Sequence, residues 1–277
     1  MSSLLNKAFV DLTNLLRLEI SHAHVVTFEE QLHSADIVPY NRIYIVKKES
    51  IENESWIINH SVSPSQKIKL EKGFIYFIPL DQKLEYNFQK GLYMIAYHFT
   101  LEIFPGFDIF SSEKLILKSI FSKEVLQLIE THCRETQSLE SIATVHGAIL
   151  MIAASFCKFT AEDIKVLSSI TEGFKPVVDY LEKCVSAQTD LTILANLIGE
   201  NREQLSKRFA RKTGIPLKKY MMKILLRKAS QLLLMSDLKI IEISEKLEFS
   251  SEHYFTRFFK KNTGVSPSQF RLNNRIE

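Results

Sequence analysis

Two stretches near the C-terminal end of the chain present polar and charged side chains at helical spacing. The displayed side chains are those of Arg202, Glu203, Ser206 and Lys207 in the first stretch and of Glu252, His253, Thr256 and Arg257 in the second. They carry hydrogen-bond donors and acceptors of the kind that can address base edges in the major groove of DNA, which an α-helix fits. Readout of a DNA sequence is therefore the chemistry that these residue types favour.

The two stretches are copies of one unit. An offset of 50 residues pairs Leu205 with Phe255, Phe209 with Phe259, Thr213 with Thr263, Gly214 with Gly264 and Tyr220 with Phe270. The preceding segment matches at an offset of 49, pairing Leu194 with Ile243, Ala195 with Ser244 and Ile198 with Leu247. Solenoid arrays need three or more repeats for stability, so two copies predict a pair of binding modules instead.

Each copy has the pattern of a helix-turn-helix. In the first copy an apolar-faced helix over 191–198 is followed by Gly199 for the tight turn, and Asn201 with Gln204 forms a capping box for a helix that ends at Thr213-Gly214. In the second copy either Ser250 or Ser251 is the cap. A helix over 220–235 would hold the units apart, and on one face of a duplex they would enter major grooves about 34 Å apart. An amphipathic bundle with a solvated polar face is the alternative.

Positive charge is concentrated in the same region. Residues 201–277 contain 17 Lys and Arg against 7 Asp and Glu, a net charge of +10, whereas the whole chain carries only +3. Such segregation is typical of a nucleic-acid or other anionic partner. The candidate phosphate contacts, which add affinity without sequence information, are Arg208, Arg211, Lys212, Lys260 and Lys261.

The stretch 243–261, with Thr263-Gly264-Val265-Ser266-Pro267 and Phe270-Arg271, resembles the signature of the AraC/XylS transcription regulators. The resemblance covers about 170–272. It implies double-stranded DNA and RNA polymerase as partners. Carried over by position, it also implies that the base-reading residues are Glu203, Ser206, Lys207, His253 and Arg257.

The sequence departs from this family pattern at three positions. Glu248 replaces the usual turn glycine of the second unit, Leu225 replaces a typical arginine, and Glu200 is polar at a usually apolar site. Glu248 puts the geometry of the second turn in doubt, and its carboxylate near a DNA phosphate would weaken binding by that unit.

The N-terminal half has a different pattern. Residues 22–110 contain short runs rich in β-branched and aromatic residues, separated by turn residues, which predicts a sandwich or barrel. Helical spacing follows over 112–160, and 160–171 is predicted to be a connection. By its resemblance the chain is expected to be α+β, with a cupin-like β-barrel for effector sensing and dimerisation over 1–165 and an all-α domain with two helix-turn-helix units over 170–277.

The cupin-like resemblance implies a small effector, often a sugar in this family. Residues with aromatic planes and polar tips suited to such a ligand are Tyr44, Trp56, His60, Tyr76 and His98, although packing in the core is the competing role for them. The leading hypothesis is a homodimeric, effector-controlled activator that is not an enzyme.

A metal-dependent enzyme of the cupin type is the rival hypothesis. His22 and His24 followed by Glu29 are similar to the metal-binding HxH…E motif. The glycines that flank this motif are absent, and Leu84 or Glu85 stands where a later histidine is expected. No metal or other cofactor is therefore expected. A helical protein–protein adaptor is a third hypothesis, and it predicts no salt-dependent DNA binding.

The remaining features are those of a cytoplasmic protein. Cys133, Cys157 and Cys184 are widely spaced and odd in number, which argues against a disulfide framework. The longest apolar stretch, 147–159, is interrupted by Lys158 and is shorter than the roughly 18 residues of a membrane span. No membrane partner is expected.

Overall fold

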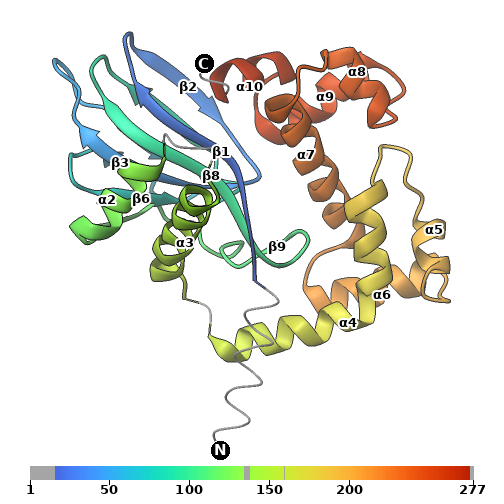
Figure 1. The fold of residues 1–277 in the computed structure, drawn as a ribbon. Coiled ribbons are helices and arrows are strands. Elements are labelled where there is room, and N and C mark those ends of the chain that lie inside the picture. Colours follow the sequence, from blue (N-terminus) through green and yellow to red (C-terminus); the bar gives the residue numbers. More distant parts are fainter. Residues whose placement is uncertain (1–15, 134–137, 159, 275–277) are drawn as a thin grey trace, which may run out of the picture. The chain divides into compact units, whose positions relative to one another are not determined.

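A computed structural model of the chain describes residues 16–133, 138–158 and 160–274 (Figure 1). They group into two compact units. The N-terminal unit contains Leu18–Leu101 and Ile109–Lys158, and the C-terminal unit contains Glu102–Asp108 and Phe159–Asn274.

The strands of the chain form two sheets. The larger sheet has the order β1 (Arg17–Thr27), β8 (Tyr93–Phe104), β3 (Asn41–Lys48), β6 (Ile75–Ile78) and β10 (Leu117–Ser119), with β9 (Phe107–Asp108) paired to β8. The smaller sheet has the order β2 (Leu32–Asp36), β7 (Leu84–Phe88), β4 (Trp56–Asn59) and β5 (Gln66–Lys69). The predicted β-rich half is confirmed. In the described part of the chain, no strand pairing joins the two sheets into a closed barrel.

The N-terminal unit is layered. One face of the larger sheet meets the smaller sheet across a core to which β3 contributes Tyr44 and Val46 and β7 contributes Tyr86 and Phe88. Side chains alternate along a strand, so Ile43 and Ile45 point to the opposite face, where they are also buried. The larger sheet is thus covered on both faces, as the run of apolar residues in β3 requires.

Two helices, α2 (Lys123–His132) and α3 (Leu139–Phe156), complete this unit. On α3, Phe156 stacks on Phe77 of β6 with ring centroids 5.4 Å apart, and Ile149 and Ile152 are fully buried. By length and composition α3 could cross a membrane, whereas no apolar stretch of about 18 residues was expected from the sequence. One such helix is weak evidence of a membrane span, because core helices and signal sequences can pass the same test.

The C-terminal unit is helical. It contains α4 (Ala161–Cys184), α5 (Leu191–Asn196), α6 (Arg202–Thr213), α7 (Leu217–Met235), α8 (Ile240–Lys246), α9 (Glu252–Thr263) and α10 (Pro267–Asn274). The predicted connection over 160–171 is helical, because α4 starts at Ala161 and continues through this segment. The apolar spacing of 164–174 is compatible with this helix.

Candidate nucleic-acid interface

Helices α6 and α9 carry the predicted base-reading residues. Positions 201–209 and 251–259 have the same order of exposed, half-buried and buried side chains. The four inward residues, Leu205, Phe209, Phe255 and Phe259, are 0% exposed. The five predicted readers lie on the accessible sides of the helices: Glu203, Lys207, His253 and Arg257 are exposed and Ser206 is half-buried.

The beginnings of the two helices are fixed by caps. Before α6, the Asn201 side chain accepts a hydrogen bond from the Gln204 amide at 2.9 Å, and the Gln204 side chain accepts one from the Asn201 amide at 3.2 Å. The predicted capping box is therefore confirmed. Before α9, Ser251 accepts a hydrogen bond from the Tyr254 amide at 3.1 Å, which settles the choice between two serines.

The ends of the two helices also match. Gly214 and Gly264 follow the helices with φ of +74° and +83°, a left-handed conformation that glycine adopts without a Cβ clash. Just before them, the Thr213 and Thr263 hydroxyls donate to the carbonyl oxygen four residues earlier, at 2.8 and 2.9 Å. The repeated Thr-Gly pair therefore ends both helices in the same way.

The turns that precede α6 and α9 have the same shape despite different residues. Gly199 has φ of +68° and Glu248, its counterpart at an offset of 49, has φ of +56°. In each copy the next amide donates to a carbonyl oxygen of the preceding helix, at 3.0 Å in the first and 2.9 Å in the second. The doubt about the second turn is thus resolved: Glu248 keeps the geometry in a conformation that is strained for a residue with a side chain.

Aromatic contacts behind α6 and α9 repeat at an offset of 50. The Phe209 and Tyr220 rings have centroids 5.1 Å apart, and the equivalent Phe259 and Phe270 rings are 5.0 Å apart. Helix α5 packs against α6, and α8 packs against α9. The chain therefore contains two helical pairs, α5–α6 and α8–α9, of closely similar internal structure.

The displayed faces of the two pairs differ in charge. On α6, Lys207 Nζ lies 2.6 Å from Glu203 Oε1, and both side chains are 75% exposed. The equivalent positions on α9 are His253 and Arg257, which include no acidic residue. An exposed ion pair of this kind contributes little to stability, but it offsets positive charge on the surface of α6. Arg202 on α6 and Glu252 on α9 reverse this difference, because with them the displayed residues have a net charge of +1 on α6 and 0 on α9.

The predicted phosphate contacts fall into two groups. Arg208 is held within the C-terminal unit: its Nε lies 2.8 Å from Glu200 Oε1, and its guanidinium lies 4.5 Å from the centre of the Phe174 ring. This ion pair accounts for the unusual polar residue at position 200. The exposed cations in the last turns of α6 and α9 are Arg211, Lys212, Lys260 and Lys261.

Two of the predicted effector residues meet inside the N-terminal unit. The Tyr44 and His98 rings lie 6.3 Å apart, and both side chains are buried. Beside them is a buried ion pair that the sequence reasoning missed, in which Arg42 Nη2 donates to Asp36 at 2.6 Å. Tyr86 donates to the other oxygen of Asp36 at 3.1 Å.

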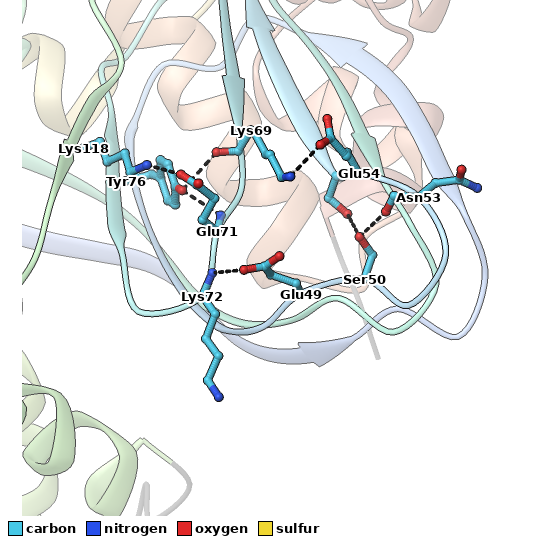
Figure 2. Close-up of polar contacts among 10 residues, drawn as sticks. Glu49, Ser50, Asn53, Glu54, Lys69, Glu71, Lys72, Tyr76 and Lys118 are labelled. Atoms are coloured by element: carbon cyan, nitrogen blue, oxygen red, sulfur yellow. Dashed lines mark hydrogen bonds and ion pairs between the residues drawn. The ribbon is translucent and has the colours of Figure 1, made fainter.

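Tyr76 has a polar role in the turn between β5 and β6. Its hydroxyl donates to the Lys69 carbonyl at 3.0 Å and accepts from the Glu71 amide at 2.7 Å (Figure 2). Glu71 also pairs with Lys118, and Lys69 pairs with Glu54 at 2.5 Å. The hydroxyl of Tyr76 is thereby committed to holding this turn.

Trp56 and His60 lie apart from that interior group. Trp56 is half-buried on β4, with the His33 ring 6.0 Å away. His60 Nε2 lies 3.0 Å from a carboxylate oxygen of Glu85, whose other oxygen is 3.0 Å from His33. The hydrogen bonds from His60 and His33 lower the pKa of Glu85. The structure therefore does not gather all five predicted effector residues at one place.

The histidines of the metal hypothesis form a ring cluster without a metal-binding arrangement. The His22, His24 and His98 ring centroids lie 5.3 to 6.0 Å from one another, and Glu29 is exposed. Within residues 16–133, 138–158 and 160–274, no three His, Cys, Asp or Glu side chains are placed to hold a metal ion.

Comparison with known proteins places the helical pairs in a family. Residues 194–273 match the family described as "Helix-turn-helix domain". The "Msm operon regulatory protein" of Streptococcus mutans is 25% identical over 152 residues, which cover 53% of this chain and 54% of that protein. The "F1 operon positive regulatory protein" of Yersinia pestis is 33% identical over 97 residues, which cover 35% of this chain and 32% of that protein. The match therefore spans about half of one relative's length and a third of the other's.

A solved structure extends the likeness of fold to most of the chain. The structure of ToxT from Vibrio cholerae has a TM-score of 0.55 to this chain, is 12% identical in sequence, and is matched over 93% of this chain and 98% of its own. It shares the arrangement of a β-rich N-terminal half with a helical C-terminal half. Residues 194–273 therefore form a helix-turn-helix domain of the matched family, in agreement with the resemblance to the AraC/XylS regulators in this part of the chain.

Proposed function

We propose that the chain is a sequence-specific DNA-binding transcription regulator of the activator type, in which both helical pairs serve as helix-turn-helix units. The observation that carries this proposal is the shared pattern of burial along 201–209 and 251–259. Equivalent aromatic contacts hold the buried sides of α6 and α9, and equivalent faces of the two helices remain accessible. The Yersinia pestis relative is called a positive regulatory protein, which supports the activator assignment.

The exposed residues of α6 and α9 fall into two groups, those that would contact bases and those that would contact phosphates. Glu203, Ser206 and Lys207 on α6, with His253 and Arg257 on α9, would read base edges. The exposed cations in the last turns of both helices would contact phosphates and release counterions, which makes binding fall steeply with salt. Arg208 is the exception among the predicted phosphate contacts, because its guanidinium is paired within the unit.

The other partners follow from the proposed function. RNA polymerase is the partner through which an activator acts. A second copy of the chain would associate through α2 and α3, on which Leu139 is 80% exposed and Met151 is 60% exposed. Exposed apolar side chains of this size favour association. Sedimentation of Leu139→Glu and Met151→Glu as monomers, beside a dimeric wild type, would support this contact, and unchanged dimers would contradict it.

A small effector would bind the N-terminal unit.

Arg257→Ala is the direct test of base reading by α9. The operator would first be obtained by selecting random DNA with the purified protein, and affinity would then be measured by gel shift. The substitution should cost about 1–3 kcal/mol on the selected site and relax the preference at one or two base pairs. Arg257 is exposed, so the fold should be unaffected.

Two further variants separate base reading from charge. Lys260→Ala should weaken binding to all sequences alike and reduce the salt slope by about 1. Lys90→Ala makes the same charge change at an exposed position of the N-terminal unit and should leave binding unchanged. Unaltered affinity and site preference in Arg257→Ala would contradict the assignment.

A further inference from the structure

A cavity of about 310 Å³ lies between the larger sheet and the two helices of the N-terminal unit. Its wall is formed by Ile20 and Ala23 of β1, Tyr97 of β8, His132 and Cys133 at the end of α2, and Ser141, Ile142, Val145 and His146 of α3. None of the residues predicted to bind an effector lines it. Its volume is at the small end of ligand pockets, which are roughly 300–1,000 Å³.

A buried hydroxyl on this wall is unsatisfied. Tyr97 is 1% exposed, and its hydroxyl oxygen has no hydrogen-bond partner among the residues that the structure describes. A buried polar group in this state is costly, and such groups in native proteins generally have a partner in a water or ligand. Burial, with a smaller effect from Cys133, raises the pKa of Tyr97. The hydroxyl is therefore protonated at neutral pH and can donate a hydrogen bond.

The other polar groups on the wall have partners. His132 Nδ1 lies 2.8 Å from the Ser141 hydroxyl, and His146 Nε2 lies 3.4 Å from the Leu18 carbonyl. The wall contains no lysine or arginine, so a carboxylate would enter without a fixed opposite charge. The rest of the wall is apolar at Ile20, Ile142 and Val145.

We propose that this cavity binds a compact, uncharged, mostly apolar molecule that carries one carbonyl oxygen, with the Tyr97 hydroxyl donating a hydrogen bond to that oxygen. The apolar body would lie against Ile20, Ile142 and Val145. The volume holds roughly ten waters, so it fits a single ring with a short substituent better than a long chain. Its role as the effector site rests on the proposed regulatory function, but its capacity to bind does not.

The test uses acetophenone and ethylbenzene as probes on the purified full-length chain without DNA. They have similar size, and only acetophenone has a carbonyl oxygen. By calorimetry or NMR titration, acetophenone should bind the wild type, and Tyr97→Phe should weaken it by about threefold to tenfold. Ethylbenzene binding should be unchanged by Tyr97→Phe. Benzoate, which adds a charge, should bind more weakly than acetophenone.

A second pair of variants locates the binding. Val145→Trp fills the cavity and should abolish binding of both probes, whereas Ala143→Trp changes an exposed position of the same helix away from the cavity wall and should not. The proposal is overturned if acetophenone and ethylbenzene respond alike to Tyr97→Phe, as they would if the hydroxyl only meets water. Probe binding to a Val145→Trp protein that remains folded would also overturn it.

Binding of the probe and binding of DNA can fail separately. Arg257→Ala should leave acetophenone binding unchanged, because the DNA-reading helix does not line the cavity. Loss of DNA binding with intact probe binding would count against the proposed function alone. Normal DNA binding with no probe binding would count against the cavity alone.

Discussion

His98 shows how a single side chain makes stability depend on pH. It is 5% exposed and its ring stacks on Tyr40, with centroids 4.9 Å apart. Burial lowers the pKa of His98 well below its usual value, and the charges of Arg42, His24 and His22 lower it further. The folded chain therefore holds this imidazole neutral, whereas the unfolded chain takes up the proton near pH 6.5.

The sign of the pH effect follows from that difference. Above about pH 6.5 both states leave His98 neutral and its contribution to stability is complete. As the pH falls below this value, the unfolded chain binds the proton first, so stability is lost by up to about 1.4 kcal/mol per pH unit. Denaturant unfolding from pH 7 to pH 5 should therefore show a smaller loss in His98→Asn than in the wild type. His253→Asn is the matched control at an exposed position, and equal losses in all three proteins would contradict the account.

Much of the candidate interface was predictable at the residue scale because its determinants are local in sequence. Asn201 and Gln204 are three residues apart, and the repeated Thr-Gly pairs stand at the ends of their helices. The buried pair of Asp36 with Arg42 was missed, because sequence alone does not show which polar residues a sandwich encloses. The Glu200–Arg208 ion pair was missed for a similar reason: each residue was interpreted singly.

At the scale of elements, the turns before α6 and α9 are an internal comparison between glycine and glutamate. Both turns need a left-handed residue, and a side chain in that conformation costs about 1–2 kcal/mol. Glycine avoids this cost, but it loses more backbone entropy than glutamate on folding, which offsets part of the advantage. The second helical pair therefore folds against a strain that the first avoids.

Glu248→Gly should raise the free energy of unfolding of the C-terminal unit by about 0.5–1 kcal/mol. It should also strengthen DNA binding, because it removes a negative charge from the second helical pair. Urea unfolding and gel shift measure the two effects. The converse variant, Gly199→Ala, should cost about 1 kcal/mol from backbone strain alone, since a Cβ there meets no atom within 4 Å. A destabilised Glu248→Gly protein would contradict this account.

The elements of the N-terminal unit were predicted less well than those of the C-terminal unit. Runs rich in β-branched and aromatic residues indicated strands, but the order of strands in the two sheets depends on pairings such as β3 with β8, which are distant in sequence. The cavity beside Tyr97 likewise needs β1, β8, α2 and α3 together. No spacing within one segment could reveal it.

At the scale of the whole molecule, the chain combines a β-rich unit with a helical unit that contains two similar helical pairs. The charge of the chain is distributed in the same way, with +10 over residues 201–277 and −7 over the rest. Segregated charge favours binding of a polyanion by one unit and leaves the other free to bind a different ligand. The repeat, the charge and the family match all concern the C-terminal unit.

The central claim is that both helical pairs read DNA. Its most direct measurement is selection of random DNA by the purified chain, followed by hydroxyl-radical footprinting on the selected site. The account predicts two blocks of preferred bases about 10 base pairs apart, with Lys207→Ala relaxing one block and Arg257→Ala relaxing the other. A single preferred block that only Arg257→Ala alters, or no preferred block at all, would contradict it.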